Sequence, residues 1–112
     1  MQVKRIPHGD VTVLELSGKI MGGPEFEVFK AEISDLIEAG RSHVILDLGD
    51  VPWLNSSGLG MLITAHHSLK AAAGTLKMCN LNERVLSIFQ VSRLERVFEV
   101  HPDREKALAS YR

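Results

Sequence analysis

The sequence predicts an α/β fold: a mixed, mostly parallel β-sheet flanked by α-helices. Short runs of β-branched and aliphatic residues alternate with segments whose apolar residues recur at helical spacing. Residues 44–48 are almost wholly apolar, as in a central strand covered on both faces. Helices between consecutive strands favour parallel pairing with right-handed crossovers. The 112 residues can bury a core without disulfides, so we expect a single domain over residues 1–112.

The first half of the chain predicts a hairpin followed by a helix. Residues 3–6 and 11–16 are rich in strand-forming side chains, and residues 8–10 between them have the composition of a tight turn. Pro24 suits the first position of a helix, because its missing N–H would have no partner there. The helix should end at Gly40. Its expected apolar face comprises Phe26, Phe29, Ile33, Leu36 and Ile37, and we expect both phenylalanines in the core.

The second half continues the alternation and completes the order β-β-α-β-α-β-α-β-α. The central strand at 44–48 is followed by a loop at 49–55. The elements expected after this loop are a helix ending at Gly74, a strand at 75–79, a helix at 83–91, a strand at 97–100 and a helix at 103–111 after Pro102. The expected inner face of the first of these helices comprises Leu59, Leu62, Ile63, His66, Leu69 and Ala73.

Composition argues against several classes of protein. Lys and Arg number 13 and Asp and Glu 14, which gives a net charge of −1, and the basic residues do not cluster. We therefore expect no nucleic-acid partner. No apolar run approaches the ~18 residues of a membrane helix, and no signal-peptide core is present, so no membrane insertion is expected. Cys79 is the only cysteine, which fits a reducing, cytoplasmic location and a buried structural role.

The start of the second helix carries residue choices that folding alone does not require. Ser56 and Ser57 are adjacent hydroxyls at a predicted helix N-terminus, where free N–H groups and the helix dipole stabilise an added phosphate. Gly58 and Gly60 leave the first turn open to another protein's active site, although each glycine costs about 1 kcal/mol in a helix interior. A simpler interpretation is that Asn55 or a serine only caps the helix, and spacing alone favours it.

The run DLGDVPWLNSSGLG at residues 47–60 resembles the signature of the STAS domain, in the branch of bacterial anti-sigma-factor antagonists. The segment LSGKI at residues 16–20 resembles the second strand and the Gly-x-hydrophobic turn of that family. The match covers essentially the whole chain in order and length. The resemblance implies a small binding protein without catalytic activity or cofactor, with a sheet flanked by helices on one side.

The resemblance also implies a switch. In this family a serine kinase of the anti-sigma-factor type, with a GHKL-like ATP site, phosphorylates the serine after the acidic residue of an Asp-Ser-Ser/Thr-Gly motif. That serine corresponds to Ser56. The unphosphorylated antagonist binds the kinase and frees a sigma factor, and a PP2C-type phosphatase restores the binding form. Ser57 is then the neighbour of the switch and the expected cap.

Two positions depart from the family pattern. Asn55 stands where the motif has its acidic residue, and Met21 replaces an aspartate that often follows the Gly-x-hydrophobic turn. The loss of both carboxylates weakens docking to a kinase that relies on them, but it leaves the phosphate acceptor in place. A neutral Asn55 can still cap the helix and reduces repulsion against phosphoserine.

We expect the partner-binding surface to surround the phosphosite. Trp53 and Met61, if exposed, would supply the aromatic and flexible apolar contacts that are typical of interfaces, although either could instead belong to the core. The expected set comprises Trp53, Asn55, Ser56, Ser57, Gly58, Leu59, Gly60 and Met61.

Other functions remain open at this stage. The alternatives are a STAS scaffold that is never phosphorylated, as in a signalling or lipid-transport assembly, a small-ligand-binding domain, and a weak hydrolase. The chain lacks Gly-x-Ser-x-Gly, and Gly-Leu-Gly at 58–60 completes neither a dinucleotide nor a P-loop motif. Neighbouring helix residues point about 100° apart, so His66 and His67 predict no metal site, and His66 is expected at the core edge. Asp47 is expected to order backbone N–H groups and Asp50 to lie in a turn.

Overall fold

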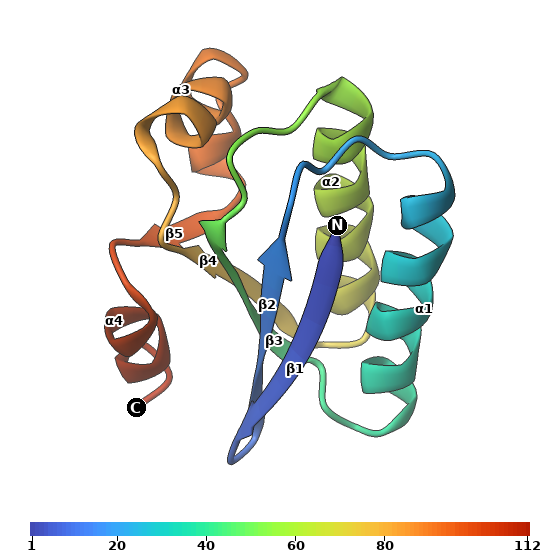
Figure 1. Cartoon of the computed structure of the whole chain (residues 1–112). Coiled ribbons are helices and arrows are strands. Elements are labelled where there is room, and N and C mark those ends of the chain that lie inside the picture. The colour runs from blue at the N-terminus through green and yellow to red at the C-terminus, as the bar shows by residue number, and fades with distance from the viewer.

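The computed structural model describes residues 1–112 and shows one five-stranded sheet with helices on both faces (Figure 1). Strands follow the order β1-β2-β3-β4-β5; β1 and β2 are antiparallel and every other neighbouring pair is parallel. The predicted fold class and element order are confirmed. The elements are β1 (Gln2–His8), β2 (Val11–Ser17), α1 (Pro24–Glu38), β3 (His43–Asp50), α2 (Ser56–Ala71), β4 (Thr75–Cys79), α3 (Glu83–Val91), a 3-10 helix η1 (Leu94–Arg96), β5 (Glu99–His101) and α4 (Arg104–Ala109).

Most element boundaries agree with the sequence patterns, and the differences have local causes. The strand expected at 97–100 begins two residues later, because Leu94 accepts the N–H groups of Val97 and Phe98 and closes η1. Asp103 caps α4 through the Lys106 N–H and lies outside the helix. Ala73, with φ of 59°, is the left-handed residue that ends α2, and not the expected Gly74.

The larger core lies between one face of the sheet and three helices. Helices α1, α2 and α3 pack there against side chains of the three middle strands, and β3 is central as predicted. Phe29 is fully buried, as expected, whereas Phe26 is half-buried and packs against the same core at its edge. None of the helices has the length and apolar character needed to cross a membrane.

The opposite face of the sheet carries α4, which corrects the expectation of helices on one side only. The cause is that β2 and β3 bury apolar residues of both parities: Val13 and Ile45 point to one face, and Leu14 and Leu46 to the other. The face of Val13 and Ile45 carries a second, smaller core, which α4 covers. It comprises Val11, Val13, Ile45, Cys79 and Ala107. Cys79 is buried as expected, and burial, followed by the nearby Asp47 carboxylate, raises the pKa of its thiol to about 12.

Candidate functional site

The predicted phosphoacceptor lies at the first position of α2. Asn55 is the N-cap, and its Oδ1 accepts the Gly58 N–H at 2.7 Å, which confirms the capping prediction for Asn55. The expectation that Ser57 is the cap is wrong, because Ser57 lies inside the helix, one residue beyond Ser56. Both serines are exposed, and the first turn contains no acidic residue. Ser56 thus presents a free hydroxyl beside uncompensated helix N–H groups.

A neighbouring loop holds this helix start in place. The Ile20 N–H donates to the Trp53 carbonyl and the Asn55 N–H donates to the Ile20 carbonyl, each at 3.2 Å, so the two segments pair like parallel strands. Gly22 adopts a φ of 81°, and a Cβ there would lie 2.7 Å from Cβ of Ser57. The position of the two serines therefore depends on contacts with the loop between β2 and α1.

The two glycines of the first turn have different roles. A Cβ on Gly58 would lie 2.1 Å from the Ile20 carbonyl oxygen, whereas a Cβ on Gly60 would meet nothing within 4 Å. Gly58 is buried against the chain's own backbone, so the expectation that it opens the turn to a partner is wrong. Gly60 alone leaves open surface.

We expect Gly58→Ala to lower the free energy of unfolding by about 1–3 kcal/mol, because the Ile20 carbonyl must shift and strain its hydrogen bond. Gly60→Ala is the matched control and should raise it by up to about 1 kcal/mol through helix propensity. Urea denaturation of both variants at neutral pH measures the difference. Equal effects of the two substitutions would show that the close approach of Ile20 to Gly58 does not exist in solution.

The other expected contact residues divide between surface and core. Met61 is 1% exposed, so its assignment to the binding surface is wrong; it lies on the side of α2 that packs in the larger core. Leu59 is half-buried against the same core. Trp53 is half-buried, and the Arg84 guanidinium lies 5.7 Å from its ring centroid. Met21 is 42% exposed in the loop next to Gly22.

Sequence patterns did not identify Arg84 as part of this region. Arg84 belongs to α3, and Asn82 fastens that helix to the loop before α2. The Asn82 Nδ2 donates to the carbonyls of Val51 at 3.2 Å and Pro52 at 3.4 Å, and its Oδ1 accepts the Val85 N–H at 2.8 Å. An asparagine before a helix indicates a cap, but no local pattern shows which distant loop its amide binds.

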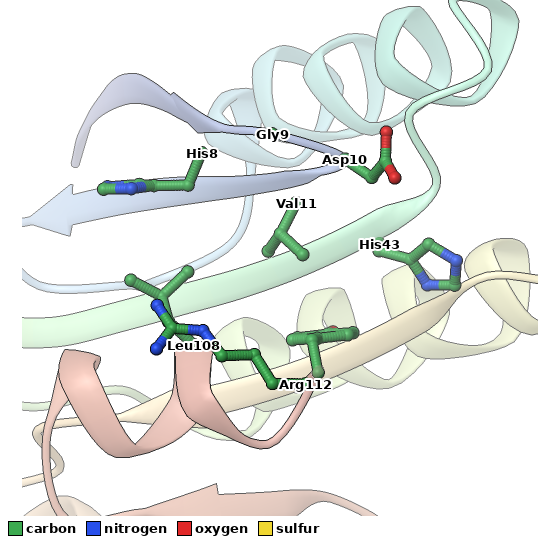
Figure 2. Close-up of a pocket in the computed structure, with 8 residues that line it drawn as sticks. His8, Gly9, Asp10, Val11, His43, Leu108 and Arg112 are labelled. Carbon is green, nitrogen blue, oxygen red and sulfur yellow. The ribbon is translucent and has the colours of Figure 1, made fainter.

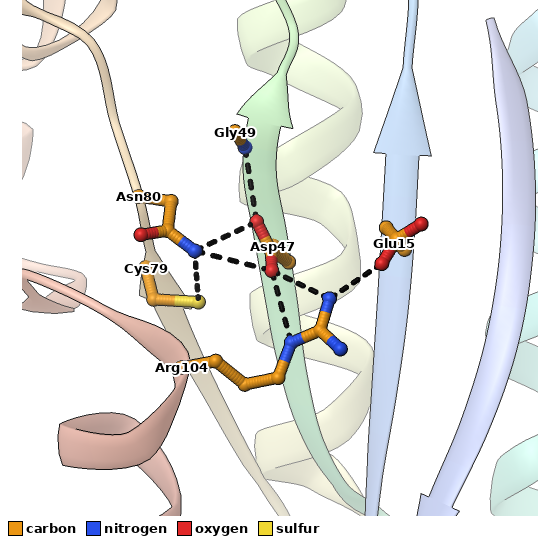
Figure 3. A network of polar contacts seen from close by, with 6 residues as sticks. All are labelled: Glu15, Asp47, Gly49, Cys79, Asn80 and Arg104. Carbon is orange, nitrogen blue, oxygen red and sulfur yellow. Dashed lines mark hydrogen bonds and ion pairs between the residues drawn. The ribbon is translucent and has the colours of Figure 1, made fainter.

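A polar network lies at the carboxyl ends of β2, β3 and β4 (Figure 3). Asp47, 6% exposed, accepts the Gly49 N–H at 3.0 Å, which confirms its predicted role toward the backbone. The Asn80 Nδ2 donates to both carboxylate oxygens of Asp47, at 3.1 and 3.2 Å. Arg104 donates to Asp47 from Nε at 3.0 Å and Nη2 at 2.7 Å, and from Nη2 to Glu15 at 2.5 Å.

This network keeps Asp47 ionised. Burial by itself raises the pKa of the Asp47 carboxyl, but the hydrogen bonds from Gly49, Arg104 and Asn80 outweigh it and lower the pKa below its ordinary value. Asp50 is exposed at the end of β3. The Leu48 carbonyl accepts the Val51 N–H at 3.0 Å and closes a turn with Gly49 and Asp50 at its centre, which agrees with the expected turn position.

The histidines of α2 lie away from the serines. His66 is half-buried at the core edge, as expected, with its ring edge-on to Phe98 at 5.3 Å. Its Nδ1 has no hydrogen-bond partner, and burial, then the charges of His67 and Lys70, lower its pKa. No three His, Cys, Asp or Glu side chains are grouped so that they could hold a metal ion.

A cavity of about 520 Å³ lies at the other end of the sheet, between the β1–β2 turn and the end of α4 (Figure 2). It is lined by His8, Gly9, Asp10, Val11, His43, Leu108, Tyr111 and Arg112. Because β3 begins at this cavity and ends beside the loop before α2, the two places are separated by roughly 20–25 Å of strand. A molecule in this cavity would not touch Ser56.

Residues 2–107 match the family model of the STAS domain. BtrV of Bordetella bronchiseptica, named as a candidate anti-sigma factor antagonist, is 28% identical over 93 residues, which cover 83% of this chain and 80% of BtrV.

Two solved proteins share the fold. A candidate anti-sigma factor antagonist from Thermotoga maritima has a TM-score of 0.88 at 20% identity, covering 96% of this chain and 92% of its own. The anti-sigma factor antagonist SpoIIAA, in its unphosphorylated form, has a TM-score of 0.74 at 20% identity over 98% and 96% of the two chains. The phosphorylated form of SpoIIAA, a Bacillus cell fate determinant, has a TM-score of 0.73 at 24% identity over 99% and 98%.

Proposed function

We propose, because this chain belongs to the STAS domain family, that it is an anti-sigma-factor antagonist whose partner binding is switched by reversible phosphorylation of Ser56. The observation that carries the proposal is the exposed Ser56 hydroxyl at the start of α2, capped by the neutral Asn55 and without an acidic residue in the first turn. A phosphate there meets free N–H groups and no nearby carboxylate of its own helix. The solved phosphorylated form of SpoIIAA supports a switch of this kind.

The proposed partners are a serine kinase of the anti-sigma-factor type, with a GHKL-like ATP site, and a PP2C-type phosphatase. The partner-facing residues are Trp53, Ser56, Ser57 and Gly60, with Met21 in place of the buried Met61. Asn55 and Gly58 position the helix, and Leu59 anchors it to the core. Residues 1–112 act as one domain, and a role in freeing a sigma factor implies a cytoplasmic location.

We also propose that the chain binds without catalysing a reaction. Activation of Ser56 as a nucleophile would need a base within hydrogen-bond reach. His66 lies ten residues further along α2, about 15 Å away at the rise of an α-helix, and packs on Phe98. The relatives named above are called antagonists, which describes binding.

Phosphosite mapping tests the proposed switch. The wild type, Ser56→Ala and Ser57→Ala are incubated with ATP and the purified anti-sigma-factor kinase of the host, and the products are analysed by tandem mass spectrometry. We expect one phosphate on the wild type and on Ser57→Ala, and none on Ser56→Ala. A phosphate on Ser57, or an unmodified wild type, would contradict the assignment of Ser56.

A further inference from the structure

Helix α3 continues the surface that begins at Trp53. In Figure 1 the loop before α2 runs between α2 and α3, and α3 lies at the edge of the molecule. The side chain of Asn82 ties this loop to the start of α3, and the Arg84 guanidinium lies 5.7 Å from the ring centroid of Trp53. The region around Ser56 and the outer side of α3 therefore form one continuous surface.

An apolar stripe follows Arg84 along α3. Arg84, Ile88 and Val91 are four and three residues apart, so they lie on the same side of the helix. Ile88 is half-buried against the core, and Val91 is 86% exposed. No other large apolar side chain is as exposed: Val28, the next, is 63% exposed and lies on α1. Val91 lies at the end of α3 away from Trp53, and exposed apolar side chains are typical of the centre of an interface.

Three arginines of α3 and of the segment directly after it have no carboxylate partner. Arg84, Arg93 and Arg96 are exposed and make no side-chain hydrogen bond or ion pair, whereas Arg5 and Arg104 are paired with carboxylates. Arg93 and Arg96 lie in the turn and the 3-10 helix that follow α3. The only carboxylates of these segments are those of Glu83 and Glu95, so the segments carry a net charge of +1. The whole chain has a net charge of −1. The surface formed by Arg84, Ile88, Val91, Arg93 and Arg96 is called the α3 surface below.

We propose that the α3 surface is a second part of the partner-binding site and takes an apolar patch of the partner protein that is bordered by carboxylates. This inference rests on the proposed function of Ser56. Free guanidinium groups attract such a patch and speed its encounter. A phosphate on Ser56 adds about −1.5 to −2 charges, which exceeds the net charge of +1 of the segments that form the α3 surface. The same modification therefore repels the acidic partner from the whole surface.

The apolar stripe is tested with a matched pair of valines. Val91→Gln and Val28→Gln each replace an exposed valine on a helix, and neither touches the core. Binding to the purified anti-sigma factor that the wild-type chain retains from its host, identified by mass spectrometry, is measured by calorimetry. We expect Val91→Gln to weaken binding about fivefold or more and Val28→Gln to change it less than twofold.

The charges are tested with two triple variants of equal net charge. Arg84→Gln/Arg93→Gln/Arg96→Gln should slow association about tenfold at low salt and flatten its salt dependence, since rim charges act on the association rate. Lys4→Gln/Lys30→Gln/Lys106→Gln removes three exposed charges elsewhere and should change the rate less than twofold.

Ser56→Asp in the same assay separates the two proposals. If Ser56→Asp weakens binding while both the Val91 and the arginine variants bind like the wild type, the α3 surface is wrong and the switch at Ser56 stands. If none of these variants weakens binding, or the wild type retains no anti-sigma factor, both proposals are wrong.

Discussion

Phosphorylation of Ser56 should weaken partner binding by about thirtyfold to several thousandfold and leave the fold intact. The phosphate would lie at the first position of α2, beside free N–H groups and the neutral Asn55, so the folded chain tolerates it. A partner surface shaped for a hydroxyl would have to bury the dianion without a counter-charge. An unpaired charge at an interface costs about 2–5 kcal/mol, and each ~1.4 kcal/mol is a tenfold loss of affinity.

Substitutions at Ser56 and at a second serine of α2 separate this effect from a general disturbance of the helix. Ser56→Asp should reproduce part of the loss, because it carries one negative charge and not two, and Ser56→Ala should bind constitutively. Ser68→Ala is the matched control, an exposed serine about three turns further along the same helix and outside the partner-facing residues. Calorimetry with the purified anti-sigma factor gives the affinities, and thermal melting checks the fold. Equal affinities of the phosphorylated and unmodified wild type would refute the switch.

Arg104→Met should lower the free energy of unfolding by about 3 kcal/mol. Removing one partner of a buried ion pair leaves the other charge uncompensated, which costs about 3–5 kcal/mol. The lower end of this range applies, because the Arg104 side chain is 30% exposed and water screens part of the interaction. Methionine retains the apolar stem that packs on the sheet. Lys106→Met, an exposed lysine on the same helix, should change stability by less than about 0.5 kcal/mol.

A second substitution and a pH series identify the Asp47 charge as the cause. Asp47→Asn with Arg104→Met should be more stable than Arg104→Met alone, because no buried charge is left unpaired. In the wild type the pKa of Asp47 is lowered, so its contribution is present above the unfolded pKa near ~3.9 and is lost as pH falls through the lower folded value. The difference in the free energy of unfolding between the wild type and Arg104→Met, measured by urea denaturation, should therefore shrink below about pH 4. A difference that does not depend on pH would contradict this explanation.

Local patterns in the sequence determined most of the fold. The order of strands and helices, the hairpin, the start of α1 at Pro24 and the cap of α2 at Asn55 were all predicted, because each depends on residues within one turn or one strand of each other. The family followed from the motif at residues 47–60, which is contiguous. The exposed serines were predicted as a pair, and the structure places both on the surface.

The tertiary structure alone decided which side chains of the motif face solvent. Met61 is buried because its side of α2 packs in the core, and residue 58 must be glycine because the Ile20 carbonyl lies against it. The helical pattern of the sequence shows neither the place of the core nor the place of Ile20. Arg104 meets Asp47 across 57 residues of sequence. The contact of Arg84 with Trp53 likewise depends on how α3 docks on the loop. Periodicity and caps report neighbours along the chain, whereas these contacts join distant segments that meet only when the core closes.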